Sequence, residues 1–255
     1  MTREDEAGGG RLDIAMVAAG LVPTRSRARD LIGRGYVTVN GRLVTKPGAT
    51  VTAMAHIALG PDAPQFVSRG AEKLAAALSA FSFEPMGLCA LDVGASTGGF
   101  TEILLQHGVR RVYAVDVGHD QLHPRLRADG RVVVLERTDA RSLSPERVPE
   151  AVSAIVADLS FISLTKALGP ALALSAPGAW LVALIKPQFE VGRDAVGKGG
   201  VVSDPAARAR AVETVQAWLE TVPGWRAAGI VPSPITGGDG NAEFLLGARY
   251  EGQGQ

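Results

Sequence analysis

At 255 residues, the chain is long enough to form one large domain and a second, smaller one. Hydrophobic residues make up 46% of it and charged residues 20%, a balance typical of a soluble globular protein. The single cysteine, Cys89, excludes an internal disulfide and fits a reducing compartment. The four histidines lack the spacing of metal ligands, so we predict no metal site.

The charges are unevenly distributed, although the formal net charge of the whole chain is zero. Residues 11–60 contain seven Lys or Arg against two Asp, a net charge of +5. A basic segment attached to a mildly acidic body indicates an appendage that binds a polyanion. Residues 1–10 are acidic and rich in glycine, and we expect them to be disordered.

The basic segment has the pattern of two helices followed by a β-hairpin. Apolar residues recur at helical spacing within 11–20. Thr24 can cap a second helix, and Gly35 can end it. Asn40-Gly41 lies between two β-prone runs, which is a strong signal for a hairpin. One further strand is expected at 56–59.

After a proline-marked linker at 61–67, strands and helices alternate. Short apolar runs suited to buried parallel strands occur at 88–93, 111–117, 132–135, 154–158 and 180–185. Helical patterns occur at 97–107, 121–127, 164–175 and 204–220, with Ser203 as the cap of the last, and two final strands are expected at 222–231 and 243–248. This alternation predicts a doubly wound α/β sheet.

The charge-free run at 167–185 is about long enough to span a membrane. Pro170, Pro177 and Gly178 interrupt it, so a helix joined by a turn to a buried strand explains it better. No signal peptide is recognisable at the N-terminus. We therefore expect a cytoplasmic protein that does not bind membranes.

A glycine-rich loop follows the first strand of the alternating region and opens a helix. Gly94, Gly98 and Gly99 let the backbone approach a ligand closely, but their spacing differs from that of a dinucleotide site. Asp92, at the strand tip, suits the ammonium of a methionine moiety. Asp116, at the end of the next strand, can accept hydrogen bonds from ribose hydroxyls. We predict a nucleoside cofactor, and favour S-adenosylmethionine over NAD.

Two further charged residues end predicted strands, Asp158 the fourth and Lys186 the fifth. Ligands of open α/β sheets bind at this edge. A lysine at the end of a buried strand is unusual. We therefore interpret the pair as part of a reactive site.

Five runs in series resemble the TlyA family, historically called hemolysins, over the region from Arg11 to Arg249. They are Val67–Lys73, Asp92–Thr101, Ala157–Ser163, Lys186–Gly192 and Gly240–Phe244. The resemblance implies an S4-type α+β RNA-binding domain at 11–60 and an FtsJ/RrmJ-like domain at 68–250, followed by a short tail at 251–255. The second domain would have a Rossmann-like methyltransferase fold with a mostly parallel seven-stranded sheet.

The resemblance also implies an activity and its residues. Members of the family are S-adenosylmethionine-dependent 2′-O-methyltransferases of ribosomal RNA. The implied catalytic set is Lys73, Asp158, Lys186 and Glu243. The expected cofactor-binding residues are Asp92, Gly94, Ala95, Ser96, Thr97, Gly98, Gly99, Phe100, Asp116, Val117 and Asp139. The expected RNA-binding residues are Arg11, Arg25, Arg27, Arg29, Arg34 and Lys46.

The role of Lys186 in that set has two interpretations. A ribose hydroxyl is a poor nucleophile at neutral pH, so a neutral Lys186 could remove its proton as general base. Alternatively, a charged Lys186 could stabilise the developing alkoxide. Burial and Lys73 would favour the neutral form, whereas Asp158 and Glu243 would oppose it. The sequence leaves both roles open.

We expect a monomer that acts on ribosomal RNA or on a ribosomal subunit. The short tail, compared with members that modify both subunits, favours a cytidine ribose of 23S rRNA over one of 16S rRNA. Three alternatives compete with this function: a methyltransferase for small molecules or proteins, a membrane-active hemolysin, and a non-catalytic assembly factor. The complete set of four charged residues argues against the last.

Overall fold

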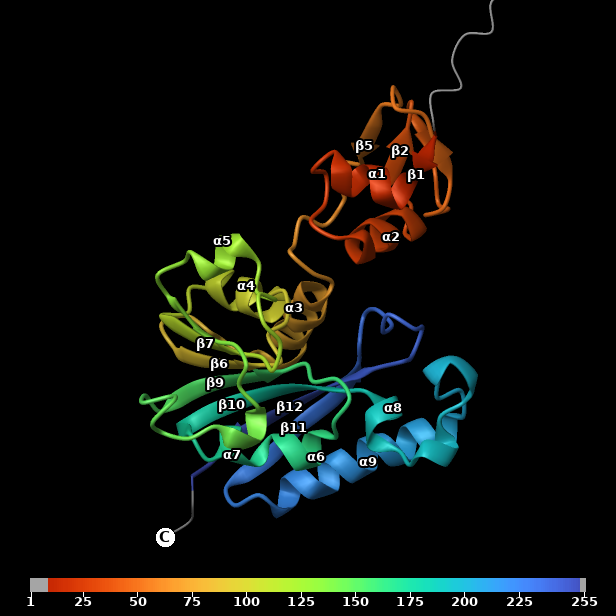
Figure 1. Cartoon of the computed structure of the whole chain (residues 1–255). Coiled ribbons are helices and arrows are strands. Elements are labelled where there is room, and N and C mark those ends of the chain that lie inside the picture. The colour runs from red at the N-terminus through yellow and green to blue at the C-terminus, as the bar shows by residue number, and fades with distance from the viewer. Residues whose placement is uncertain (1–8, 253–255) are drawn as a thin grey trace, which may run out of the picture. The chain divides into compact units, whose positions relative to one another are not determined.

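A computed structural model describes residues 9–252 and divides the chain into two units between Phe66 and Val67 (Figure 1). The predicted tail residues 253–255 and residues 1–8 of the predicted N-terminal segment lie outside the described residues. Gly10, which we expected to be disordered, belongs to a short strand.

The first unit packs two helices against short strands. Helix α1 spans Leu12–Ala18 and α2 spans Arg25–Gly33, and β1 (Gly10–Arg11) pairs with β4 (Thr50–Val51). A second sheet has the order β3-β2-β5, with bounds Arg42–Leu43, Val37–Val39 and Ile57–Leu59. The core of the first unit includes the fully buried side chains of Leu12, Met16 and Ile32.

Local signals in this unit act as predicted. The Thr24 side chain accepts a hydrogen bond from the backbone N–H of Arg27 at 3.2 Å and so caps α2. Asn40 and Gly41 have φ of 50° and 76° and join paired residues Val39 and Arg42. Two positive φ angles match the right-handed twist of a two-residue hairpin, which confirms the predicted turn.

A buried carboxylate organises the basic face of this unit. Asp13 is fully buried and accepts hydrogen bonds from Arg11, Arg25 and Arg29 at 3.0–3.2 Å. The bond from Arg11 contributes most to holding the pKa of Asp13 well below its usual range, with those from Arg25 and Arg29 adding to it. Each of the three arginine side chains is about half exposed, so one acid fixes three cationic heads at the surface.

The second unit contains a seven-stranded sheet within the described residues, in the order β11-β12-β10-β9-β6-β7-β8. The bounds are β6 Cys89–Val93, β7 Arg111–Val115, β8 Val132–Leu135, β9 Val152–Ala157, β10 Ser175–Ile185, β11 Trp225–Pro232 and β12 Phe244–Tyr250. Strands β10, β9, β6, β7 and β8 pair in parallel, whereas β12 is antiparallel to both of its neighbours. The predicted mostly parallel sheet is confirmed.

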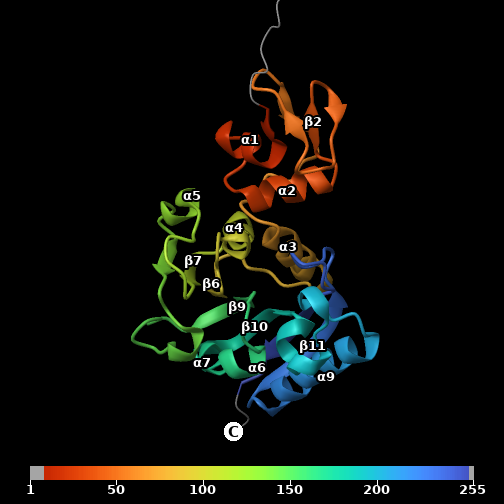
Figure 2. The same ribbon diagram turned by 45° about the vertical axis from the view of Figure 1, so that its right-hand side comes forward.

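Helices cover both faces of this sheet, as both views show (Figures 1 and 2). On one face lie α3 (Gly70–Phe81), α4 (Gly99–Gln106) and α5 (Pro124–Arg127). On the other lie α6 (Leu164–Ala167), α7 (Gly169–Leu172) and α9 (Pro205–Thr221). Helix α8 (Pro187–Glu190) follows β10 directly. Because both faces are covered, the central strands β6 and β9 are apolar except for Asp92 and Ser153.

Two local predictions differ from the structure, and one helix was missed. The predicted helix at 164–175 is divided into α6 and α7, because Pro170 has no N–H with which to continue α6. Asp204, not Ser203, caps α9, and its carboxylate accepts the N–H groups of residues 206 and 207. Helix α3 was not predicted as an element.

The strand order creates a switch point between β6 and β9. The chain proceeds from β6 to β7 and β8 on one side, and then returns to place β9 on the other side of β6. The loops after β6 and β9 therefore leave the sheet in opposite directions and open a crevice at its carboxyl edge. Among the described residues, no helix is both long and apolar enough to cross a membrane.

We predict that Asp13→Asn destabilises α1 and α2 by about 1.5–3 kcal/mol at pH 7, because hydrogen bonds to a buried carboxylate are lost. The pKa of Asp13 is lowered by folding, so its contribution is complete above the unfolded value of about 4 and is lost as the pH falls below it. The measurement is urea-dependent hydrogen exchange of residues 12–33 in the full chain.

The exposed Asp62→Asn removes the same charge and should leave that exchange unchanged. Equal stability of the Asp13 and Asp62 variants at pH 7 would contradict the structural role given to Asp13.

Candidate active site

Four charged side chains from distant parts of the sequence meet at the carboxyl edge of the sheet. Lys73 lies in the first turns of α3, Asp158 directly follows β9, Lys186 directly follows β10, and Glu243 directly precedes β12. They are the four residues of the predicted catalytic set. Parallel pairing of β9 with β10 and antiparallel pairing of β10 with β12 align three of these positions.

The four side chains form a chain of ion pairs. Lys73 Nζ lies 2.6 Å from Glu243 Oε2 and 4.0 Å from Asp158 Oδ2. Lys186 Nζ lies 2.6 Å from Asp158 Oδ1. Asp158 therefore stands between the two ammonium groups, and Glu243 holds Lys73 from the other side.

Burial makes this pairing necessary. Lys73 is 6% exposed, Lys186 9% and Glu243 4%, while the side chain of Asp158 is 22% exposed. Removing a charge from water costs several kcal/mol unless an opposite charge compensates it. Two cations and two anions balance here, so removal of one partner leaves another uncompensated.

Ser160 and Phe161, next to this group, were not singled out by the sequence. Lys186 Nζ donates a hydrogen bond to Ser160 Oγ at 2.8 Å. Phe161 is 90% exposed, has a φ of 66°, and lies 5.2 Å from the ring of Phe189. A positive φ is strained for a residue with a side chain, and such strain concentrates at functional sites. The strain and the exposure are visible only in the structure.

The glycine-rich loop packs closely against this group. Gly94 has a φ of 86°, and a Cβ atom there would lie 2.7 Å from the backbone oxygen of Asp158. A Cβ atom on Gly99 would lie 2.9 Å from the backbone nitrogen of Ala71 in α3. Only glycine permits both approaches, so the loop after β6 contacts the segments that carry Asp158 and Lys73.

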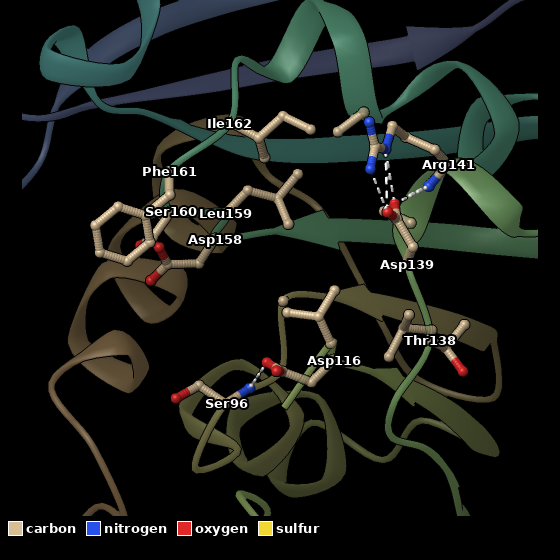
Figure 3. A pocket seen from close by; sticks show the side chains of 15 residues that line it. Ser96, Asp116, Thr138, Asp139, Arg141, Asp158, Leu159, Ser160, Phe161 and Ile162 are labelled. Carbon is tan, nitrogen blue, oxygen red and sulfur yellow. Dashed lines mark hydrogen bonds and ion pairs between the residues drawn. The ribbon is translucent and has the colours of Figure 1, made fainter. Parts of the chain in front are cut away.

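A cavity of about 460 Å³ opens beside the loop, within the range of about 300–1,000 Å³ typical of small-molecule sites. Five of the predicted cofactor-binding residues line it: Gly94, Ser96, Asp116, Val117 and Asp139. Residues 158–162 line it from the opposite side (Figure 3). The polar and apolar walls fit the ribose and the base of a nucleoside.

Two carboxylates project toward this cavity from the ends of neighbouring strands. Asp116 accepts hydrogen bonds from the N–H groups of Ser96 at 2.8 Å and Gly118 at 2.7 Å, which fix its orientation. Hydrogen bonding and ion pairing with Arg141 lower the pKa of Asp139 to about 2. Each oxygen of Asp116 accepts one bond and so retains a lone pair for a ligand, whereas both oxygens of Asp139 already accept hydrogen bonds from Arg141.

A second cavity of about 190 Å³ adjoins the first and shares Gly94, Ser96, Asp158 and Ser160 with it. It extends to Lys186, and the predicted residues Ala95, Thr97, Gly99 and Phe100 also line it. Ser68 and Gly70, which the sequence did not indicate, complete its wall. The smaller cavity therefore lies between the larger one and Lys186.

Asp92 and Gly98 line neither cavity. Asp92 is fully buried and accepts a hydrogen bond from Thr101 Oγ1 at 2.6 Å, whereas its other oxygen has no hydrogen-bond partner. Burial raises the pKa of Asp92 to about 7. Gly98 has a φ of 97° at the start of α4 and packs against Leu126. The predicted contact of Asp92 with a cofactor ammonium gains no support from this placement.

The predicted RNA-binding residues of the first unit fall into two groups. Arg11, Arg25 and Arg29 surround Asp13 at the surface, and Lys46 is exposed. The other group is held by Asp30: Arg34 lies 3.5 Å from it and stacks on Tyr36.

Arg27 is a correction to the predicted set. Its side chain is 4% exposed, forms an ion pair with Asp30 at 3.1 Å and donates a hydrogen bond to the backbone oxygen of Pro64. A guanidinium engaged in this way inside the unit does not present itself to RNA phosphates, so we assign Arg27 a structural role.

One group of potential metal ligands occurs among the described residues, at His119, Asp120 and Glu136. Glu136 already accepts three backbone N–H groups and the guanidinium of Arg127, and hydrogen bonding to Arg127 lowers its pKa to about 2. Its oxygens stabilise the loop after β7, which explains the cluster without an ion.

Both parts of the chain match known protein families. The model of the FtsJ-like methyltransferase family matches residues 66–250, and that of the S4 domain matches residues 10–57. The 16S/23S rRNA (cytidine-2′-O)-methyltransferase TlyA of Mycobacterium tuberculosis is 46% identical over 94% of this chain and 90% of its own. Hemolysin A of Brachyspira hyodysenteriae is 40% identical over 92% of this chain and 98% of its own.

The solved structure of a provisionally named hemolysin from Streptococcus thermophilus matches with a TM-score of 0.76 and 36% identity, over 98% of this chain and 91% of that one. The family match covers the whole seven-stranded sheet and all four residues of the charged chain. The protein therefore belongs to the TlyA group of FtsJ-like, S-adenosylmethionine-dependent methyltransferases, with an S4 domain preceding the enzyme domain.

Proposed function

We propose that the protein transfers a methyl group from S-adenosylmethionine to the 2′-hydroxyl of a cytidine in ribosomal RNA. The observation that carries this proposal is the Glu243–Lys73–Asp158–Lys186 chain beside the nucleoside cavity. The named activity of the Mycobacterium tuberculosis relative and the S4 domain support the substrate class. Cytoplasmic location and a monomeric state belong to the same proposal.

Bound S-adenosylmethionine supplies an activated methyl group on a sulfonium. Asp116 and Asp139 would hold its nucleoside part, because both carboxylates face the larger cavity. The backbone at Ala95, Ser96 and Thr97 lines the smaller cavity, which leads from there to Lys186. The loop and the acids would thereby hold the cofactor with its methyl group on the side of Lys186.

Lys186 then acts on the ribose hydroxyl. Its Nζ forms an ion pair with Asp158 at 2.6 Å and donates a hydrogen bond to Ser160 Oγ, so it is oriented as a donor at the sheet edge. We therefore favour the second of the two roles: the ammonium hydrogen-bonds the 2′-oxygen and stabilises negative charge as the proton leaves for solvent. Lys73 and Glu243 hold Asp158 in place and balance the charge.

RNA recognition would be shared between two kinds of surface. Arg11, Arg25 and Arg29 present preorganised guanidinium groups that suit phosphate oxygens. The exposed ring of Phe161, at the rim of the cavity, offers a flat surface on which a base can stack. Both features favour a nucleic acid over a small-molecule substrate.

Two other functions receive less support. The name of the Brachyspira relative suggests a membrane-active role. The buried ion pairs at the sheet edge would contribute nothing to such an activity. A non-catalytic assembly factor would need neither the nucleoside cavity nor the buried lysines, which cost stability to keep. Whether 16S or 23S rRNA is the substrate is decided by which of the separated ribosomal subunits accepts the methyl group.

Lys186→Ala should abolish methyl transfer, a loss of at least 1,000-fold, because the charge at the reacting oxygen disappears. S-adenosylmethionine affinity, measured by calorimetry, should change less than about threefold. The exposed Lys166→Ala, in α6, is the matched control and should keep wild-type turnover.

Lys186→Arg separates the two roles, since arginine keeps the charge but cannot serve as a base. Activity clearly above that of Lys186→Ala is expected. Wild-type turnover in Lys186→Ala would overturn the assignment of the site, and equal inactivity of both variants would favour the general-base role.

Asp116→Ala should raise the dissociation constant of S-adenosylmethionine about 10-fold or more, because a charged hydrogen-bond acceptor for the cofactor is lost. Isothermal titration calorimetry on the full chain measures this effect. Asp194→Ala removes an exposed carboxylate that lines neither cavity and serves as the control. An unchanged dissociation constant in the Asp116 variant would contradict the location of the nucleoside.

Arg25→Ala should weaken binding of ribosomal RNA. It should also reduce the slope of log K against log salt concentration by about 1, the value for one lost phosphate contact. Asp13 keeps Arg11 and Arg29, so the unit should remain folded. Arg226→Ala, in β11, is the control for loss of charge. Filter binding across a range of salt concentrations gives both slopes, and identical slopes would exclude a phosphate contact at Arg25.

A further inference from the structure

Glu190 contacts the loop that carries Asp158, although it belongs to neither the charged chain nor the cavities. It is the last residue of α8, the helix that begins directly after Lys186. Glu190 Oε2 accepts a hydrogen bond from Ser163 Oγ at 2.6 Å, and its Oε1 accepts one from the backbone N–H of Leu164 at 2.9 Å. These two partners stand where the loop ends and α6 begins.

The same short helix contacts the loop at three points. At its start, Lys186 binds Asp158 and Ser160. Near its end, the ring of Phe189 contacts Phe161. At its last residue, Glu190 holds the far end of the loop. Residues 158–163 are therefore attached to one rigid turn along their whole length.

Burial of the Glu190 carboxylate costs free energy, which its two hydrogen bonds offset. Burial raises the pKa of its carboxyl group, which indicates an unfavourable environment for a charge. A buried acid remains stable only where donors satisfy its oxygens, and here the hydroxyl of Ser163 and the N–H of Leu164 do so. Without Glu190, that N–H at the start of α6 loses its acceptor, and only the capping Ser163 remains there.

The loop that Glu190 holds includes a strained residue. Phe161 has a φ of 66° and is 90% exposed, so its own side chain contributes little to keeping that conformation. Without Glu190 the loop would keep its contacts at Asp158, Ser160 and Phe161 but would be free at its far end, so this angle could relax. Relaxation would move Ser160, which accepts a hydrogen bond from Lys186, and so would disturb the ammonium.

We propose that Glu190 is a positioning residue for methyl transfer: it attaches the end of the 158–163 loop to α8 and thereby sets Ser160 and Phe161 relative to Lys186. The proposal rests on the proposed function, because it assigns Glu190 a role in that reaction. Glu190 lines neither cavity and acts through the loop.

The test compares Glu190→Ala with Glu190→Gln in the full chain. Glutamine can accept from the N–H of Leu164 and donate to Ser163 Oγ, so it can satisfy both partners. Glu190→Ala should lower kcat on ribosomal RNA about 10- to 100-fold, with the dissociation constant of S-adenosylmethionine changed less than about threefold. Glu190→Gln should restore kcat to within about threefold of wild type.

Glu150→Ala is the matched control for general loss of stability. Glu150 binds Arg110, Arg111 and Tyr113 at the opposite, amino-terminal edge of the sheet, so its loss should destabilise the unit without lowering kcat. Unchanged kcat in Glu190→Ala would overturn the proposal, and so would equal losses in the alanine and glutamine variants or in Glu150→Ala.

A readout independent of activity separates this proposal from the proposed function. Hydrogen exchange of residues 159–165 should accelerate in Glu190→Ala, but not in Glu190→Gln, while residues 94–98 of the glycine-rich loop stay protected. If wild-type protein fails to methylate ribosomal RNA, the proposed function is wrong, yet the exchange pattern still tests whether Glu190 holds the loop. Unaltered exchange of 159–165 in Glu190→Ala would refute that attachment.

Discussion

The pairing of two buried lysines with two carboxylates is the constraint on which the active region depends. Lys73, Asp158, Lys186 and Glu243 come from four separate segments and form two close ion pairs, which the 4.0 Å approach of Lys73 to Asp158 joins into one group. Isolated, each would cost several kcal/mol to bury. The charges of the site are therefore balanced only in the correctly assembled sheet edge.

The sheet topology meets this condition with little additional machinery. The switch point between β6 and β9 opens the crevice, and the bare backbone of Gly94 lets the loop after β6 contact the loop after β9. The larger cavity and the ammonium group of Lys186 thus both lie against Asp158. Helix α8 joins the end of β10 to the loop after β9, because Lys186 pairs with Asp158 and Glu190 accepts the N–H of Leu164. A single helical turn thus fixes the two strand ends relative to each other.

Much of this arrangement could be predicted from the sequence, because its signals are local. Asn40-Gly41 specifies a hairpin through backbone twist, and the apolar runs specify buried parallel strands. Lys73 and Glu243 were different: their grouping came from family resemblance, since no local pattern shows that residues 170 positions apart meet. Buried Arg27 and Asp92, exposed Phe161 and the Glu190 contacts depend on tertiary packing, which periodicity does not encode.

In the proposed reaction, the four paired charges at the sheet edge direct a methyl group to a ribose oxygen of ribosomal RNA. The most direct measurement is incubation with methyl-labelled S-adenosylmethionine and separated ribosomal subunits, followed by alkaline hydrolysis and nucleotide mapping. We expect label in a cytidine whose 3′ phosphodiester bond resists hydrolysis, because a 2′-O-methyl group prevents attack by the 2′-oxygen. Label on a base, on ribosomal protein, or on no subunit component would contradict it.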